Sequence, residues 1–404
     1  WIREQKYKDP AFGDWTRPSW GDYAQDSISV FEQKTIEGHA VRATLLATGI
    51  TAVALENNSP EYVQTIKQLW DNMTGKRMCI TGGVGAGFGE EKFGPDYFLP
   101  TDSYLETCAA VGAGFFSQRM NELTADAKYM DEFERALYNN VLTGISLSGD
   151  KYTYQNPLNA HHHSRWDWHP CPCCPPMFLK IVSAVPGYIY ASQADNLYIN
   201  LFIGSRTTIS LNGNPVQISQ ETEYPWKGNI KVNIHPEKET RFTVKIRIPG
   251  WAQGKENPFD LYMSNLKPQI KLTVNGIVQN LKLENGYATI KRKWKKGDLL
   301  ELSLPMQPRI ITANEHVKEL KEMVTLASGP LIYCFESIDN KDLDNLKLNT
   351  ASQFDLVYQK DLLNGVNVIT GMAKDNDVDV PVTAIPYYVV GNRGDAGYKT
   401  WLLK

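Results

Sequence analysis

The feature of this 404-residue sequence that most constrains its fold is a change in hydrophobic period near residue 195. Before that point, apolar residues recur three or four positions apart, as they do from Tyr62 to Met73, which indicates amphipathic helices. After it, apolar and polar residues alternate, as in RFTVKIRIP at 241–249, which indicates strands with one buried face. In KLTVNGIVQNLKL at 271–283, an Asn-Gly pair separates two strand-like runs and predicts a hairpin. The pattern therefore predicts helices followed by antiparallel β-structure.

The length of the chain allows two or three domains, each with its own core. We expect a helical domain over 1–193, a β-sandwich over 194–310, and a second β-sandwich or a set of return strands over 311–404. Long loops that contain Gly and Pro join the expected helices, and loops on a rigid helical scaffold commonly carry function.

Composition and charge argue against several classes of function. The net charge is -3 and the pI is about 6.2, whereas a nucleic-acid partner requires a basic surface. No apolar run approaches the ~20 residues that span a bilayer, and the N-terminal WIREQKYKDPAFGDW does not resemble a signal peptide. Because the sequence lacks an initiator Met, we expect a processed chain or a piece of a longer one. The compartment stays open between the periplasm and the cytoplasm of a bacterium.

Three of the six cysteines, Cys171, Cys173 and Cys174, lie within HPCPCCPPM at 169–177. Six cysteines are too few for a disulfide scaffold, and adjacent cysteines rarely pair because the ring they close is strained. The spacings C-x-C and C-C also differ from the C-x-x-C of thiol redox proteins. Thiolates this close repel one another unless a cation holds them, and zinc is the usual soft partner. The cluster therefore predicts a zinc site that takes further ligands from elsewhere in the chain.

Glu106 and Cys108 in LETC are the best candidates for those further ligands. They also have a purely structural interpretation, because Ser103 and Glu106 have the spacing of a helix capping box and Cys108 could be a core residue. Residues two apart lie on nearly opposite faces of a regular helix, so this pair can share a metal only at an irregular helix start. Both interpretations stay open.

Three other polar segments are weaker signals. TGGVGAGFGEE lacks the Gly-Lys-Ser/Thr ending of a phosphate-binding loop, and we interpret it as a flexible loop that presents Glu90 and Glu91 near a site. HHHSRWDWH contains three consecutive histidines that cannot all bind one ion, and we expect a partly exposed loop there. His39 lies in a mostly apolar helical stretch, where a satisfied core histidine is the default interpretation.

Six motifs together carry a resemblance to a known family: EGHAVRA, GGVGAGFGEEKFGPDYFLP, ETCAA, YQNPL, CPCCPPM and AIPYYVVGNRG. In these motifs the chain resembles the zinc-dependent, cysteine-using β-L-arabinofuranosidases of glycoside hydrolase family 127 and the related family 146. The pairing of Cys-Cys-Pro-Pro with Glu-Thr-Cys is the specific part. The resemblance implies an (α/α)6-barrel-type helical catalytic domain followed by antiparallel β-sandwich domains. It also implies that the N-terminal part of the barrel lies outside this chain.

Carried over residue by residue, the resemblance implies that Cys173 is the catalytic nucleophile. It implies that Glu106, Cys108, Cys173 and Cys174 bind Zn2+. The chemistry is coherent, because the thiolate is the nucleophile and zinc coordination removes the proton that a free thiol carries near neutral pH. Most retaining glycosidases use two carboxylates, so a cysteine nucleophile would be an exception to the usual pattern.

For the general acid/base, the resemblance implies Glu91 or Glu90. The family pattern Glu-x-Phe fits Glu91 with Lys92 and Phe93, whereas counting back from Glu-Thr-Cys points to Glu90, and we prefer Glu91. His39 and Tyr154 match substrate-contacting positions.

The implied function is retaining hydrolysis of β-L-arabinofuranosides or of a closely related plant-polysaccharide furanoside, with a carbohydrate as the partner. Met177 stands where many relatives have Asn, and HHHSRWDWHP differs from the commoner approach to the cysteines. The sugar therefore stays open, and the branched acidic furanose of complex pectin is the alternative substrate. Two other classes are a non-catalytic, zinc-stapled carbohydrate-binding protein and a thiol redox protein. The oligomeric state also stays open, a homodimer included.

Overall fold

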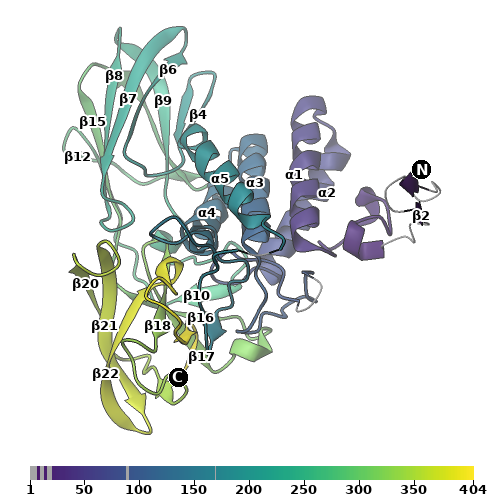
Figure 1. Cartoon of the computed structure of the whole chain (residues 1–404). Coiled ribbons are helices and arrows are strands. Elements are labelled where there is room, and N and C mark those ends of the chain that lie inside the picture. Colours follow the sequence, from purple (N-terminus) through teal and green to yellow (C-terminus); the bar gives the residue numbers. More distant parts are fainter. Residues whose placement is uncertain (1–6, 10–12, 16–20, 88–90, 169) are drawn as a thin grey trace.

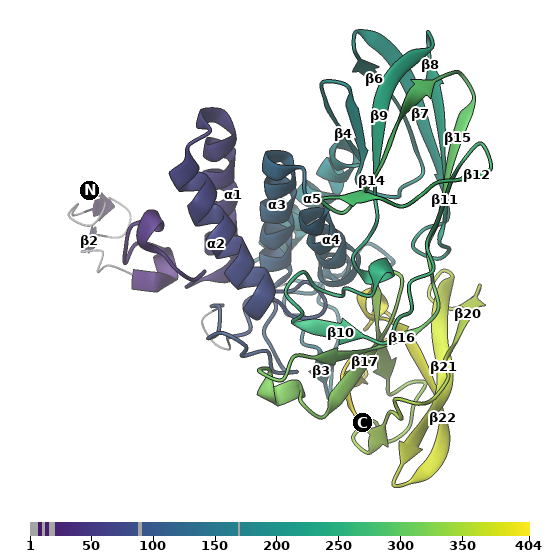
Figure 2. The same cartoon turned by 180° about the vertical axis from the view of Figure 1, so that it is seen from behind.

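The computed structural model describes residues 7–9, 13–15, 21–87, 91–168 and 170–404. Its helices lie in the middle of the molecule, and two β parts lie beside them, one next to their upper ends and one next to their lower ends (Figure 1). The view from behind shows the same arrangement (Figure 2). The expected order, helices and then mainly antiparallel strands, is confirmed, and two strand pairings among the described residues are parallel. Among the described residues, no helix has both the length and the apolar character needed to cross a membrane.

Five α-helices occur among the described residues: α1 (Ala40–Asn57), α2 (Pro60–Lys76), α3 (Thr107–Thr124), α4 (Ala127–Ala136) and α5 (Cys174–Ala184). Shorter helical turns are Gly21–Ala24, Val30–Glu32, Leu137–Val141, Leu142–Gly144, Val185–Tyr188, Trp251–Gln253, Lys318–Leu320 and Tyr387–Val389. Helix α3 is central, with α1, α4 and α5 packed around it, and almost all of its residues are buried. This position explains why its residues from Cys108 to Ser117 are all apolar or small.

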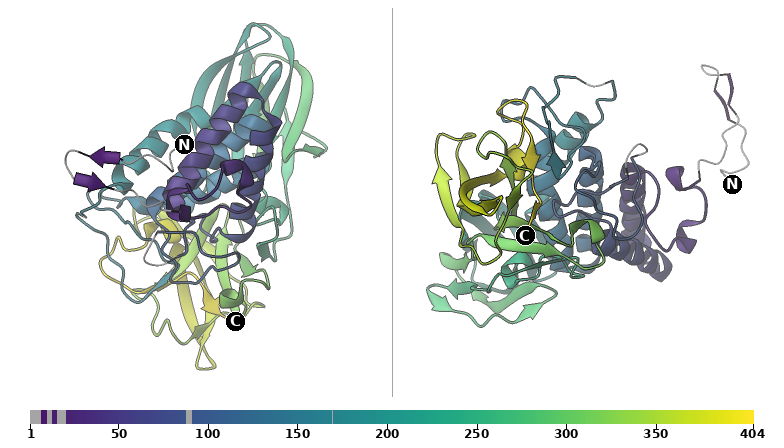
Figure 3. Two further views of the ribbon diagram at one scale, coloured as in Figure 1. Left: turned by 90° about the vertical axis from the view of Figure 1, so that its right-hand side faces the viewer. Right: turned by 90° about the horizontal axis from the view of Figure 1, so that it is seen from below.

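Helices α1 and α3 approach each other closely where Gly112 faces Thr44. A Cβ at Gly112 would lie 2.1 Å from Thr44 Oγ1, which is far inside van der Waals contact. The close approach therefore requires glycine at this position of α3. Seen from the side, the helices stack in front of the β-structure (Figure 3).

The first β part is a sandwich of two sheets. One sheet has the order β12-β11-β15-β8-β7-β6 and the other β13-β14-β9-β5-β4. The strands are β4 (Tyr190–Gln193), β5 (Asn196–Ile199), β6 (Ser205–Leu211), β7 (Asn214–Thr222), β8 (Asn229–Pro236), β9 (Thr240–Arg247), β11 (Lys271–Val274), β12 (Ile277–Val278), β13 (Leu283–Glu284), β14 (Tyr287–Trp294) and β15 (Asp298–Ser303). The inward residues of both sheets form one core. The predicted Asn-Gly hairpin is confirmed, since β11 pairs with β12 across Asn275 and Gly276, which both have positive φ.

The second β part is a sheet that closes on itself. Its strand order is β10-β16-β17-β24-β19-β21-β22-β18-β23-β3, and β20 pairs with β21. Because β17 also pairs with β18, the strands from β17 to β18 in this order form a closed ring. The strands are β10 (Tyr262–Ser264), β16 (Arg309–Ala313), β17 (Met323–Ser328), β18 (Leu331–Glu336), β19 (Leu346–Lys347), β20 (Asp355–Gln359), β21 (Val366–Asp375), β22 (Val378–Pro386), β23 (Tyr398–Lys399) and β24 (Leu402–Leu403). The short strand β3 (Asn159–Ala160) comes from the helical part and pairs with β23. Closure removes exposed strand edges.

Ion pairs also connect the sandwich to the helical part. Arg247, on β9, is fully buried, and its guanidinium bonds to Asp131 at 2.6 Å and to Glu134 at 2.5 Å on α4. The alternation in β9 places Arg247 on the side away from the sandwich core, and the helical part covers that side. The two parts are therefore joined through ion pairs that are shielded from water.

Candidate functional site

The four side chains that the resemblance assigned to zinc lie at the N-termini of two helices. Glu106 is the N-cap of α3, and Cys108 is the second residue of that helix. Cys173 is the N-cap of α5, and Cys174 is its first residue. The N-terminus of a helix favours negative charge and lowers the pKa of a thiol. Two such ends therefore converge on one group of potential anions.

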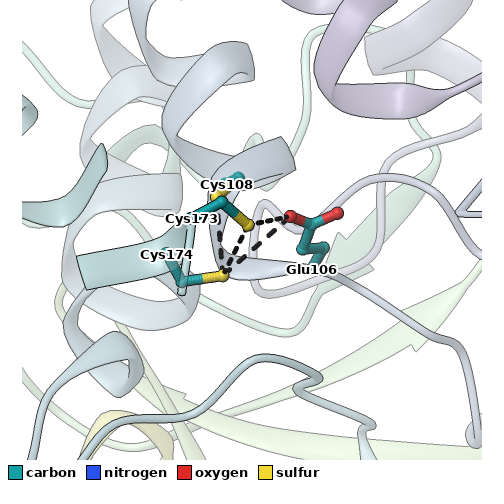
Figure 4. A group of neighbouring side chains, drawn as sticks. All are labelled: Glu106, Cys108, Cys173 and Cys174. Carbon is teal, nitrogen blue, oxygen red and sulfur yellow. Dashed lines mark hydrogen bonds between the residues drawn. The ribbon is translucent and has the colours of Figure 1, made fainter. Parts of the chain in front are cut away.

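The donor atoms of this group lie close together (Figure 4). The Sγ of Cys108 is 3.4 Å from the Sγ of both Cys173 and Cys174, and those two are 3.9 Å apart. Oε1 of Glu106 lies 3.4 Å from Cys173 Sγ and 3.9 Å from Cys174 Sγ. Sulfur ligands about 2.3 Å from a tetrahedral zinc lie roughly 3.8 Å from each other. The observed separations therefore fit one zinc-sized ion held by three sulfurs and a carboxylate.

The local backbone explains how Glu106 and Cys108 share one site. Glu106 has φ -60° and ψ 137°, which is not helical, so the opposite-face rule of a regular helix does not apply to it. The capping-box interpretation is wrong, because α3 begins at Thr107 and the Ser103 hydroxyl donates to the Pro100 carbonyl oxygen instead. At α5, prolines 175 and 176 fall in the first turn, where a missing N–H costs no helical hydrogen bond.

The four donors could hold a cation, because several groups that can carry negative charge lie close together. Burial, followed by the charge of Cys173, raises the pKa of Glu106 to about 8. Hydrogen bonds to Cys173 and Cys174 raise the pKa of the Cys108 thiol far above its usual range, whereas hydrogen bonds from Cys108 and Cys174 lower that of Cys173 far below it. Four donors this close can all be ionised only if a positive ion compensates them. Glu106 Oε2 is buried and has no hydrogen-bond partner among the described residues.

Glu91 forms a second group next to the first. Its Oε2 lies 2.7 Å from His39 Nε2, and its Oε1 accepts hydrogen bonds from Tyr104 at 3.1 Å and Tyr154 at 3.0 Å. Burial lowers the pKa of His39 despite the opposing effect of Glu91, so the neutral ring donates its Nε2–H to the carboxylate. Glu91 itself has φ +55°, a left-handed conformation that is uncommon outside glycine and is found at functional sites. The other candidate acid, Glu90, lies outside the described residues.

Tyr154 connects the two groups. Its hydroxyl bonds to Glu91 and also to Cys173, where it helps to lower the pKa of the thiol. Donor atoms of His39, Glu91 and Glu106 lie within 4.8 Å of one another, so the carboxylate of Glu106 borders both groups. All the described site residues named in the sequence analysis are thus brought together from helix ends and loops.

The remaining polar signals are not among the four clustered donors. Cys171 is exposed, and its thiol is in hydrogen-bond contact with Cys173 and Tyr154 at the edge of the site. All six cysteines are free. The prediction of an exposed loop is confirmed for His161 and His162, whose imidazoles lie 4.0 and 3.5 Å from the carboxylates of Asp344 and Asp395. His169 lies outside the described residues.

Sequence reasoning missed Tyr104. Its hydroxyl contacts the same Glu91 oxygen as Tyr154, yet its only signal was a position two residues before Glu106 in a loop. No local sequence pattern distinguishes a tyrosine that contacts a catalytic carboxylate from one that only packs in the core.

The whole chain is similar to one family of glycoside hydrolases. Three family models match consecutive segments: the beta-L-arabinofuranosidase GH127 catalytic domain over residues 2–187, the GH127 middle domain over 196–306, and the glycoside hydrolase family 127 C-terminal domain over 308–403.

Relatives agree with these matches over most of the chain. A non-reducing end beta-L-arabinofuranosidase from Bifidobacterium longum subsp. longum is 31% identical over 413 residues, which cover 92% of this chain. The GH127 beta-arabinofuranosidase BT3674 superposes with a TM-score of 0.91 at 38% identity, over 95% of this chain and 62% of that structure. Ara127N-Se, a GH127 beta-L-arabinofuranosidase from Geobacillus stearothermophilus T6, gives 0.89 at 35% identity, over 96% and 64%. The chain spans about 60% of the length of the Bifidobacterium relative.

Proposed function

The chain belongs to glycoside hydrolase family 127, and on that premise we propose that it carries the active site of a retaining glycosidase. The proposed substrate is a β-L-arabinofuranoside or a closely related furanoside from plant polysaccharide. The nucleophile is Cys173 and the general acid/base is Glu91. The observation that best supports the proposal is that the Tyr154 hydroxyl contacts both Glu91 and Cys173.

The donor set of Glu106, Cys108, Cys173 and Cys174 supports Zn2+ as the bound metal. Three sulfurs and one carboxylate match the ligands that zinc prefers, and the donor separations fit a tetrahedral ion. When bound, zinc would keep Cys173 as a thiolate near neutral pH and fix the position of its sulfur.

The reaction proceeds in two displacements at the anomeric carbon. In the first, the Cys173 sulfur forms a bond to that carbon while the bond to the leaving oxygen breaks, and Glu91 gives its proton to that oxygen. In the second, a water molecule attacks the same carbon, Glu91 accepts a proton from the water, and the sulfur leaves as a thiolate. Two inversions at one carbon retain its configuration, and the enzyme ends in the protonation state in which it began.

Tyr154 suits the reactive protonation state of this pair. A phenol can accept one hydrogen bond and donate another, so it can accept from a protonated Glu91 and donate to the Cys173 thiolate at the same time. His39 donates to the other oxygen of Glu91, which directs the proton of the acid to Oε1. We place His39 and Tyr154 against the substrate as well, since both lie on the Glu91 side of the site.

The test is turnover by the whole protein, reduced and supplied with zinc, on a panel of aryl furanosides that includes the β-L-arabinofuranoside. We expect the Cys173→Ser variant to lose most or all of its turnover, because a hydroxyl is a far weaker nucleophile than a thiolate. The Cys334→Ala variant is the control and keeps its turnover, because it removes a cysteine of β18 that is not one of the four clustered donors. One equivalent of zinc in the wild-type protein is the second readout.

The panel also separates the alternatives. Turnover only of an acidic furanoside would assign the branched sugar of complex pectin as the substrate. Sugar binding without turnover, retained in Cys173→Ser, would replace the proposal with a zinc-stapled binding protein.

A further inference from the structure

The carboxylate of Glu106 belongs to two groups of potential metal ligands, and only one of them has been assigned a metal so far. Its Oε1 faces the sulfurs of Cys173 and Cys174, at 3.4 and 3.9 Å. Its second oxygen, Oε2, turns away from these sulfurs (Figure 4). Oε2 is buried and has no hydrogen-bond partner among the described residues. A buried carboxylate oxygen of this kind indicates a binding position for a cation or another polar ligand.

His39 and Glu91 supply the other donors of this second group. One donor atom each from His39, Glu91 and Glu106 lie within 4.8 Å of one another. Glu91 Oε2 and His39 Nε2 are 2.7 Å apart. Nitrogen and oxygen ligands about 2.1 Å from a tetrahedral zinc lie roughly 3.4 Å from each other. A small movement of these two side chains therefore makes room for an ion in place of the proton that they share.

The surroundings of Glu91 and His39 suit metal ligands. The hydroxyls of Tyr104 and Tyr154 bond to Glu91 Oε1, which fixes the carboxylate and leaves Oε2 on the side of His39. Burial lowers the pKa of His39, and the neutral imidazole is the form that binds metals. One histidine and two carboxylates also make three protein ligands, the number found in zinc sites that keep one position open.

The charge of the centre favours a second divalent ion once the first is bound. Three thiolates and two carboxylates carry five negative charges, against two on the first zinc and one on Arg42, which acts on His39. A second divalent ion compensates the remaining two. Its affinity is lower than that of the first, because it has no thiolate ligand and because the buried Nδ1 of His39 has no partner for the proton it then carries.

We propose that His39, Glu91 and Glu106 form a second site for Zn2+, that Glu106 bridges it to the thiolate site, and that an ion bound there inhibits the enzyme. On binding, the proton of the imidazole moves from Nε2 to Nδ1, and Glu91 binds as a carboxylate. The inhibition rests on the proposed function, because a Glu91 that holds a metal neither gives nor accepts a proton. The binding itself does not depend on that function.

The first test counts and distinguishes the two ions in the whole protein. The protein is stripped of metal with a chelator, kept reduced with a phosphine, and titrated with Co2+. We expect the first equivalent to give strong near-ultraviolet absorption from sulfur-to-cobalt charge transfer. The second equivalent gives only visible bands, because its ligands are nitrogen and oxygen. Calorimetry with Zn2+ then shows two binding events, the second of them weaker.

Two variants and one control assign the second event to its residues. His39→Gln and Glu91→Gln each lose the second equivalent and keep the first, and the charge-transfer band of the first equivalent shows that the variants are folded. The control replaces His161 and His162 together with alanine, which removes two exposed imidazoles near Asp344 and Asp395. This control keeps both equivalents, because surface histidines do not form the site.

The second test follows turnover of an aryl β-L-arabinofuranoside as free Zn2+ rises above the first equivalent. At free zinc about ten times the dissociation constant of the second site, kcat/KM falls by about elevenfold. Higher substrate concentration restores the rate, because the sugar and the second ion compete for His39 and Glu91. Mg2+ at the same concentration leaves the rate unchanged, since it sheds its water ligands reluctantly.

Several results would overturn the inference: one equivalent of metal in the wild type, a second equivalent that survives in both site variants, or its loss in the histidine control. A second ion that binds without lowering turnover would overturn the inhibition. Turnover that is insensitive to excess zinc, with one ion bound, would leave the proposed function intact. Two bound ions without turnover at one equivalent would instead contradict the proposed function and leave the second site standing.

Discussion

The Tyr154 hydroxyl links the proposed acid to the proposed nucleophile, so its removal tests the geometry of the site. In Tyr154→Phe the ring and its stacking on Trp166 remain, while the contacts to Glu91 Oε1, at 3.0 Å, and to Cys173 are lost. A hydrogen bond to a charged group contributes about 1.5–3 kcal/mol. If the thiolate contact is made in the transition state, kcat/KM falls by about 10- to 150-fold.

Tyr104→Phe is the matched control for that variant. Its hydroxyl contacts the same oxygen of Glu91 at 3.1 Å, but the Cys173 thiol is not among the groups that shift its pKa. The Tyr104 hydroxyl also bonds to Gln155, and Glu91 is neutral when it acts as the acid. Loss of these neutral contacts, worth about 0.5–1.5 kcal/mol, lowers kcat/KM by about two- to tenfold.

The assay is steady-state hydrolysis of an aryl β-L-arabinofuranoside, with zinc content measured for each variant. We expect Tyr154→Phe to lose clearly more activity than Tyr104→Phe, while both variants keep the metal. Equal losses, or a larger loss in Tyr104→Phe, would show that the link to Cys173 does not contribute.

Three further predictions concern stability. Arg247→Met leaves the buried Glu134 and the partly buried Asp131 without their cation, and it lowers the free energy of unfolding by about 3–5 kcal/mol in urea titrations. Lys293→Met, which breaks an exposed ion pair, lowers it by about 0–1 kcal/mol. Similar losses of unfolding free energy in the two variants would contradict this prediction. Gly112→Ala places a Cβ 2.1 Å from a threonine hydroxyl of α1 and destabilises the protein by about 1–3 kcal/mol. Gly49→Ala, whose added Cβ has no atom within 4 Å, stabilises it by about 0.5–1 kcal/mol. A shift of the same sign for both variants in thermal unfolding would contradict this prediction. Burial lowers the pKa of His163 to about 4, below its value of about 6.5 in the unfolded chain. The unfolded state therefore binds the proton first, and the contribution of His163 is complete above pH 6.5 and is lost as pH falls toward 4. Between pH 8 and pH 5, His163 therefore lowers the free energy of unfolding by about 2 kcal/mol. His163→Asn removes this part of the pH dependence, and an unchanged pH dependence in the variant would contradict the prediction.

Local patterns were enough to predict the order of structural elements. The alternation in β9 and the Asn-Gly turn between β11 and β12 are both properties of a few neighbouring residues, and both are confirmed. The pairing of β17 with β24 could not be predicted, because no short-range pattern specifies pairing between strands that lie far apart in sequence. The full burial of Arg247 was also unexpected, since its partners lie on α4, more than a hundred residues earlier.

The site could be predicted in part for the same reason. Adjacent cysteines with two prolines form a dense local signal, and the mutual repulsion of their thiolates is enough to indicate a metal. The capping-box spacing of Ser103 and Glu106 was misleading, because a one-dimensional pattern does not say which residue precedes the first helical turn. The role of Tyr104 depends on contacts between loops, which no motif in this chain encodes.

The central claim is that Cys173 attacks the sugar. The most direct measurement is peptide mass mapping of the whole protein after reaction with a slow aryl β-L-arabinofuranoside, quenched during turnover. We expect one pentosyl adduct, on the sulfur of Cys173, and none in Cys173→Ser. An adduct on Glu91, or on another residue with Cys173 unmodified, would contradict it.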